Sequence, residues 1–285
     1  MSWFARTNGE PAALPVPVRG VAAAELPLAL DAQLFKHHFD ALMYNAGQEG
    51  HVEAWLAALG AKQQACAGLR TRAGGVTLDG IETVLGQVFT ARRRLYPALV
   101  AVGETRVSGL VRNLFGDDAP VADRIRAFVD AMPGAIDTDR ESLRAAAKLR
   151  RAAWDFAAEL VHFAEPEVYP LMSRWVWDES TQSGALREFI RGNDAMREIP
   201  FTNDPGQFEG ARCWLGERIA EEGVYRDLPL WIDLVLAQAY ASYMRSMAEG
   251  SLGADFGRGV SPHEQIRKLL GIDIVPGSGS RVKKS

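Results

Sequence analysis

The sequence has few of the residues from which disulfide frameworks and zinc sites are built. Its two cysteines, Cys66 and Cys213, lie far apart, and neither belongs to a CxxC motif or a cysteine–histidine array. The sequence therefore predicts neither a disulfide framework nor a structural zinc site. Unpaired thiols are typical of a reducing compartment, so we expect a cytoplasmic protein of bacterial type.

Long apolar runs are also missing. The most apolar stretch, Leu228 to Ala241, contains Asp233 and Gln238 and is shorter than the roughly 20 residues needed to cross a bilayer. The N-terminal residues lack the basic start and apolar run of a secretory signal. We therefore expect no export and no membrane association.

Familiar catalytic motifs are absent from the sequence. It contains no Walker glycine-lysine loop, no dinucleotide-binding glycine triplet, no nucleophile elbow and no HExxH. These absences remove the main support for nucleotide hydrolysis and for the common hydrolase mechanisms. An enzyme with unfamiliar residue spacing remains an alternative.

Alternating strand patterns are equally scarce, whereas apolar residues recur at three- and four-residue spacing along most of the chain. The sequence predicts an all-α fold, an irregular array of about nine or ten helices. Residues 1–30 are proline-rich and predict an extended arm, and residues 276–285 predict a flexible basic tail. Residues 31–275 predict a single helical domain, with two packed halves as the alternative.

Several helix boundaries follow from capping residues and prolines. We expect helices over Asp31–Gly47, His51–Arg72 and Asp139–Phe163. A further helix should run from Thr77 or Asp79 to about Leu95, with a break at Pro97 and a short helix to Val102. Helix starts are expected at Asp118-Ala119-Pro120, Asp204-Pro205 and Asp227-Leu228-Pro229, and a capping box at Ser261 should open a helix that ends at Gly271.

The charge balance gives no general attraction to nucleic acid. Lys and Arg number 32 against 36 Asp and Glu, a net charge of −4, so a phosphate-binding surface would have to be local. The densest basic run is Arg92, Arg93 and Arg94, which would form a phosphate-binding face with Lys148, Arg150 and Arg151 if their helices lie side by side. The alternative is a solvated surface with acidic residues nearby.

Glu159 and His162 are spaced as in the ExxH step of carboxylate-bridged di-iron bundles, with both side chains on one helical face. Such sites need two of these steps, and no second one exists in the sequence. We therefore predict no metal site and no cofactor. The alternative interpretation is a buried histidine bonded to a neighbouring carboxylate.

Residues 154–178 are denser in aromatic side chains than helix amphipathicity requires. One interpretation is a helix-turn-helix joint in which the rings fill a crossing. The other is the rim of a pocket with inward-facing polar residues. The candidate pocket residues are His162, Arg174, Asp178, Trp175, Trp177 and Glu159.

Part of this segment, Ala158-Glu159-Leu160-Val161-His162-Phe163 followed by Pro166-Glu167 and Tyr169-Pro170-Leu171, resembles helix-hairpin-helix DNA glycosylases. The resemblance implies a related helical fold. The residue at the position of the family's catalytic acid is Ser173, which is no carboxylate, and Asp178 is out of register. The Gly-x-Gly hairpin that grips a DNA backbone is also missing.

These observations lead to three hypotheses. The first is a non-catalytic cytoplasmic binding or regulatory protein whose partner is another protein, because no complete catalytic constellation is present. The second is a glycosylase-like protein or enzyme that acts on nucleic acid, with His162, Arg174 and Asp178 in its cleft. The third, weaker hypothesis is a metal-dependent helical oxidase built around Glu159 and His162. The second requires a basic groove beside the aromatic segment.

Overall fold

The computed structural model describes residues 20–48, 51–71, 75–116, 118–193, 198–250, 261–273 and residue 282. Over these residues the all-α prediction is confirmed, because the chain forms ten α-helices, one 3-10 helix and no strand. In chain order they are α1 (Ala32–Gly47), α2 (Val52–Thr71), α3 (Leu78–Leu85), α4 (Leu95–Val102), α5 (Glu104–Leu114), α6 (Val121–Asp130), α7 (Arg140–Ala164), η1 (Ala185–Phe189), α8 (Pro205–Glu221), α9 (Leu228–Gly250) and α10 (Pro262–Leu270).

Most of the predicted helix starts carry a side-chain cap, but Asp118 does not provide one, because Pro120 directly precedes α6 and no side chain caps that helix. The Asp139 carboxylate accepts hydrogen bonds from the backbone N–H groups of Glu141 and Ser142 at 2.7 and 3.1 Å, which satisfies two of the unpaired donors at the start of α7. The side chains of Asp31, Asp204 and Ser261 cap α1, α8 and α10 in the same way. Local sequence thus determines where these helices begin.

One predicted helix is wrong in its extent. The helix expected to run to Leu95 ends at Leu85, and residues 86–94 form turns. Pro97 does not break a helix but lies in the first turn of α4, where a residue without an N–H loses no intrahelical bond. The unpredicted helix α5 starts after Gly103, which has no side chain to serve as a visible cap.

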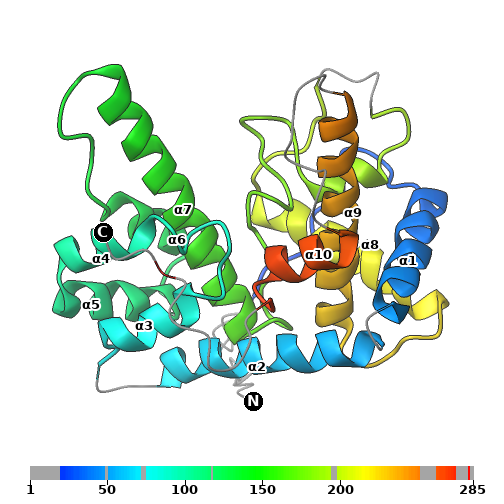
Figure 1. Ribbon diagram of the computed structural model, residues 1–285, viewed down its shortest axis with the longest axis horizontal. Coiled ribbons are helices and arrows are strands. Elements are labelled where there is room, and N and C mark those ends of the chain that lie inside the picture. Colours follow the sequence, from blue (N-terminus) through cyan, green and yellow to red (C-terminus); the bar gives the residue numbers. More distant parts are fainter. Residues whose placement is uncertain are drawn as a thin grey trace, which may run out of the picture.

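The helices form two groups that share α2 and α7 (Figure 1). One group contains α3, α4, α5 and α6, and the other contains α1, α8, α9, α10 and η1. Helix α2 runs beneath both groups and packs against α7. A single continuous cluster of buried apolar side chains extends through the two groups.

Helix α7 changes character along its length. Its C-terminal half, from Ala152 to Phe163, is buried apart from the partly exposed Trp154. Its N-terminal half is mostly exposed and projects beyond α4, α5 and α6 (Figure 1). The helix has 25 residues, which corresponds to a length of about 38 Å. One end is therefore fixed in the core while the other end stands in solvent.

The predicted arm and tail fall largely outside the described residues. Residues 1–19 and all of 276–285 except Val282 belong to that part of the chain. Residues 20–30 form neither helix nor strand, and Ala24 donates its N–H to the carbonyl of Gly206 at 2.8 Å. None of the described helices combines the length and apolar character needed to cross a membrane.

Candidate functional site

A cleft of about 330 Å³ lies at the point where α7 leaves the core. Three separate segments build it: the turns that follow α3, the middle of α7, and the loop that follows α7. Its lining residues are Phe89, Thr90, Arg93, Arg94, Lys148, Arg151, Ala152, Asp155 and Arg174. Five of the nine are basic, so the cleft concentrates positive charge in a protein whose net charge is −4.

Four of these basic side chains have no ion-pair partner among the described residues. Arg93, Arg94, Lys148 and Arg151 are exposed, and no described carboxylate lies within 4.0 Å of their charged nitrogens. Some exposed basic side chains outside the cleft are paired, as Arg126 is with Asp123 at 2.5 Å. Four uncompensated charges around one hollow give a locally positive potential that favours an anion.

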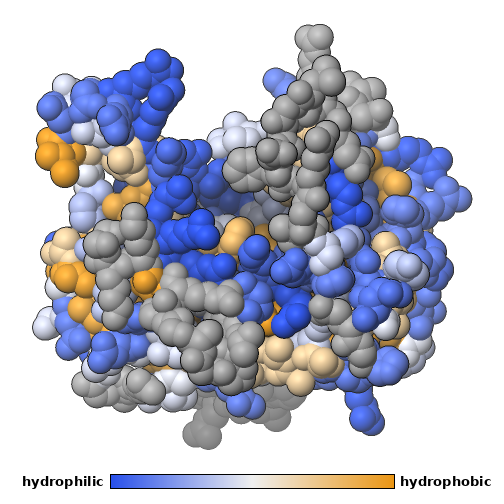
Figure 2. Space-filling view, in the orientation of Figure 1, coloured by the Kyte–Doolittle hydropathy of each residue, from blue (hydrophilic) through white to orange (hydrophobic). Residues whose placement is uncertain are grey.

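The basic character of the cleft continues along the projecting half of α7. Arg140, Arg144, Lys148 and Arg151 are spaced at three or four residues, which puts them on one face of the helix. All four are exposed, and the stripe spans about 16 Å along the helix axis. Figure 2 shows the projecting helix with a largely hydrophilic surface and a hollow at its foot. We call this set of four residues the α7 basic stripe.

Asp155 is the acidic residue in the cleft lining. Its side chain is buried, with the residue 3% exposed, and its Oδ1 accepts the backbone N–H of Arg174 at 2.9 Å. Burial raises the pKa of Asp155 to about 7, while the hydrogen bond from Arg174 and the guanidinium charge of Arg174 act in the opposite direction. The carboxyl group therefore changes its protonation state near neutral pH.

Arg174 joins the cleft to the aromatic segment. Its guanidinium forms an ion pair with Asp178, four residues further along the chain. Burial acts to raise the pKa of Asp178, but a hydrogen bond from Ser180 and the charge of Arg174 outweigh it, so the pKa lies below its usual value. Two of the predicted pocket residues are thus in contact, and one of them lines the cleft.

The predicted phosphate-binding face forms only in part. Arg93 and Arg94 line the cleft together with Lys148 and Arg151. Arg92 does not, because its side chain is buried and pairs with Asp273 at 3.4 Å. Arg150 points to the other side of α7 and pairs with Asp130 at 2.5 Å. Consecutive residues fan around their backbone, so only part of each basic run reaches the cleft.

The tryptophans of the aromatic segment lie in the core. Trp175 is 4% and Trp177 is 1% exposed, and the Trp177 indole donates to the Phe201 carbonyl at 3.3 Å. The Trp175 ring lies 6.0 Å from the Tyr240 ring. The rings therefore fill the core, as the interpretation as a structural joint predicted. The second helix of that joint is absent, because residues 165–184 form turns and an isolated bridge between Asp178 and Ser183.

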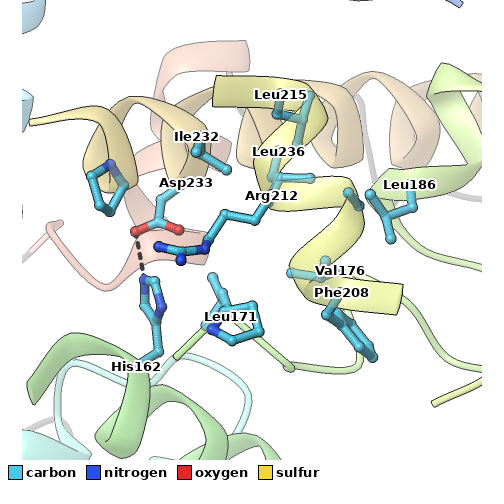
Figure 3. Close-up of a pocket in the computed structure, with 13 residues that line it drawn as sticks. His162, Leu171, Val176, Leu186, Phe208, Arg212, Leu215, Ile232, Asp233 and Leu236 are labelled. Carbon is cyan, nitrogen blue, oxygen red and sulfur yellow. Dashed lines mark hydrogen bonds and ion pairs between the residues drawn. The ribbon is translucent and has the colours of Figure 1, made fainter. Parts of the chain in front are cut away.

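His162 lies in a different place from Arg174, beside a small cavity of about 20 Å³ (Figure 3). Its Nε2 is 3.0 Å from Asp233 Oδ2, and its Nδ1 is 2.8 Å from the Tyr169 carbonyl oxygen. Because a carbonyl oxygen only accepts, Nδ1 of His162 is the donor in its contact with Tyr169. Arg212 lines the same cavity, but its guanidinium bonds to Glu209 and to the Pro166 carbonyl.

Glu159 has another partner again. The Lys62 ammonium lies 2.6 Å from Glu159 Oε2, donates to the Leu270 carbonyl at 2.9 Å and lies 4.0 Å from the centre of the Phe163 ring. Both side chains are buried, and burial raises the pKa of Glu159 against the attraction of Lys62. Glu159 and His162 thus bond to different residues, and the described residues contain no cluster suited to a metal ion.

A second open hollow, of about 480 Å³, lies between α1, α9 and the loop after η1. His38 and Glu188 line it, and His38 is buried while its neighbour His37 is exposed, as their adjacent positions on one helix predict. Burial raises the pKa of Glu188 and lowers that of His38 to about 4. This hollow mixes both signs of charge, because Asp31 and Arg191 also line it.

Asp155, Arg140 and Arg144 are charged residues of the cleft and stripe that were not predicted from the sequence. Asp155 and Glu159 are two acids one turn apart on the otherwise apolar face of Trp154 to Phe163, a pattern that indicates buried carboxyl groups. Arg140, Arg144 and Lys148 recur at four-residue intervals, which indicates a basic stripe. Both patterns are visible in the sequence. That Asp155 lies in the same cleft as Arg174, 19 residues later in the chain, is not.

The comparisons with known proteins give no match. No protein-family model fits the chain, and searches of curated proteins and of solved structures find none that is similar. The function must therefore be inferred from the site itself.

Proposed function

We propose that this protein is a nucleic-acid-binding protein that holds the phosphate backbone in the cleft and along the α7 basic stripe. The observation that carries the proposal is the set of four unpaired cations, Arg93, Arg94, Lys148 and Arg151, around one hollow. Arg and Lys side chains in such an arrangement release counterions when they neutralise phosphates, which supplies most of the affinity for a nucleic acid.

The length of the basic surface favours a polymer over a small anion. The cleft alone would suit a single phosphate group, but the α7 basic stripe, whose Lys148 and Arg151 line the cleft, extends about 12 Å beyond it to Arg140. Successive phosphates on one strand are about 3.4 Å apart along a duplex axis, so the stripe spans several of them. Arginine also matches the geometry of phosphate oxygens better than lysine does.

The resemblance of residues 154–178 to helix-hairpin-helix DNA glycosylases also supports a nucleic acid as the ligand. Residues 154–178, which resemble a segment of helix-hairpin-helix DNA glycosylases, contribute Asp155 and Arg174 to the cleft. The proposal is one of binding, in the cytoplasm, and needs no bond cleavage. A protein partner with an acidic surface is the competing occupant, and binding measurements with defined nucleic acids separate the two.

The test measures binding of labelled single-stranded DNA, single-stranded RNA and duplex DNA by fluorescence anisotropy at several salt concentrations. We expect log K to fall linearly with log salt. Replacing Arg93, Arg94, Lys148 and Arg151 by Gln should reduce the slope by about 0.7 to 0.9 for each phosphate contact removed.

The control is a variant with the same change in net charge. In it Gln replaces the paired basic residues Lys36, Arg126, Arg150 and Arg218, which lie outside the cleft. We expect this control to keep nearly the full salt slope. Equal losses in both variants, or no binding of any nucleic acid, would contradict the proposal. Binding only to acidic proteins would favour the competing occupant.

A further inference from the structure

The acid in the cleft lining is unexpected in a site for polyanions. Asp155 lies one turn from Arg151 on α7 and lines the same cleft. As a carboxylate it would repel the phosphates that the surrounding cations attract, and it has no proton to donate to them. As a carboxylic acid it carries no charge and presents an O–H donor. The two forms therefore have opposite effects on an anion in the cleft.

The backbone fixes the orientation of this carboxyl group. Oδ1 of Asp155 accepts the N–H of Arg174 at 2.9 Å, so one oxygen is held by the protein. A carboxylic acid keeps that acceptor and carries its proton on the other oxygen. Arg174, which also lines the cleft, thus positions the acid through its backbone.

We infer that Asp155 contacts the bound nucleic acid as a neutral carboxylic acid that donates its O–H to a phosphate oxygen, so that binding takes up one proton from solvent. The inference rests on the proposed function and adds a specificity-determining residue to it. The proton comes from water or buffer, remains on Asp155 in the complex, and returns to solvent when the nucleic acid dissociates.

Other charged and titratable groups lie around Asp155 on every element packed against it. On the turns after α3 and on α7 they are Arg93, Arg94, Lys148 and Arg151, which are cationic side chains. Glu159, one turn further along α7, is buried in its ion pair with Lys62. Arg174, which is paired with Asp178, lies on the loop after α7. Tyr240 comes from α9, and burial raises its pKa. No histidine lines the cleft among the described residues.

The test follows the dissociation constant for single-stranded DNA from pH 6 to 9 in the wild type and in Asp155→Asn. Asparagine keeps an oxygen for the Arg174 N–H and an N–H donor for phosphate, but it does not titrate. We expect wild-type binding to weaken by up to tenfold per pH unit above about pH 7, and the variant to bind with little pH dependence.

Calorimetry in buffers of different ionisation enthalpy should show uptake of up to one proton per wild-type complex above neutral pH, and none in Asp155→Asn. The matched control is Glu188→Gln, which removes a carboxyl group of raised pKa from the hollow beside α1. It should retain the wild-type pH dependence. Circular dichroism of each variant verifies that it is folded.

Two negative outcomes are distinguishable. If the wild type and Asp155→Asn bind nucleic acid with the same pH dependence and no difference in proton uptake, Asp155 is not the group that takes up the proton, and the inference fails while the proposed function stands. If neither protein binds nucleic acid at any pH, the proposed function fails and the inference fails with it.

Discussion

At the scale of single residues, Asp155 links the stability of the protein to pH. Its pKa is raised from 3.8 to about 7 in the folded state, mainly by burial. Between these two values the folded protein holds a proton that the unfolded chain has released. The free energy of unfolding therefore decreases as pH rises from about 4 to about 7, and this contribution is constant above that range.

Asp155→Asn should remove this pH-dependent cost. We expect the variant to be more stable than the wild type at pH 8.5, by no more than about 4 kcal/mol, because a shift of one pKa unit corresponds to about 1.4 kcal/mol. At pH 4.5, less than one unit above the unfolded pKa of 3.8, the difference should fall to about 1 kcal/mol. Urea unfolding at the two pH values measures it. A variant that is less stable than the wild type at pH 8.5 would mean that the carboxylate itself is needed for folding.

Asp155 also illustrates how far the sequence predicts the site. The basic runs were visible in the sequence, and so was the aromatic segment 154–178. The partner of Asp155 was not, because it is the backbone N–H of Arg174, 19 positions away. Likewise, the partners of His162 and Glu159, which are Asp233 and Lys62, come from helices 71 and 97 positions distant. Spacing along one helix cannot reveal contacts of this kind.

At the scale of helices, the ends of α10 show what local sequence determines and what packing adds. The cap at Ser261 and the glycine at its C-terminus were predicted, and Gly271 has a φ of +71°, in the left-handed region that favours glycine. The close approach of Gly271 to the turn after α3 was not predicted. A Cβ at this position would lie 1.6 Å from the carbonyl oxygen of Gln87.

Gly271→Ala should therefore destabilise the protein by more than backbone strain alone. The matched control is Gly223→Ala, since Gly223 has a similar φ of +87° but a Cβ there would have no neighbouring atom within 4 Å. We expect the control to cost about 1 kcal/mol and Gly271→Ala to cost distinctly more. Thermal unfolding of the two variants compares them. Equal costs would show that the contact with Gln87 relaxes freely.

Helices without a polar cap were harder to predict. Gly103 precedes α5 and supplies no side-chain acceptor, so the start of this helix has no signature in the sequence. The apolar residues of α3 and those that follow it also suggested one continuous helix, whereas the chain turns after Leu85. These turns carry Arg93 and Arg94 to the cleft and leave Arg92 buried, so their path decides which of the three arginines reaches the site.

At the scale of the whole molecule, the charge distribution matters more than the total. The net charge of −4 argues against a general affinity for polyanions, yet unpaired cations gather at one cleft and along one projecting helix face. The acids outnumber the bases elsewhere on the chain. Such an asymmetry directs an anionic ligand to one side of the protein and is screened by salt.

The projecting half of α7 has a further consequence, for attack by proteases. A helix with few tertiary contacts opens locally at low cost in free energy, and trypsin cuts opened chain after lysine and arginine. The α7 basic stripe offers it Arg144 and Lys148 at exposed positions. Nucleic acid bound along the stripe should slow cleavage after these two residues and leave cleavage after Arg126 on α6 unchanged, which mass spectrometry of a timed digest can follow. Digestion at the stripe that is equally fast with and without nucleic acid would mean that the ligand does not lie along this helix.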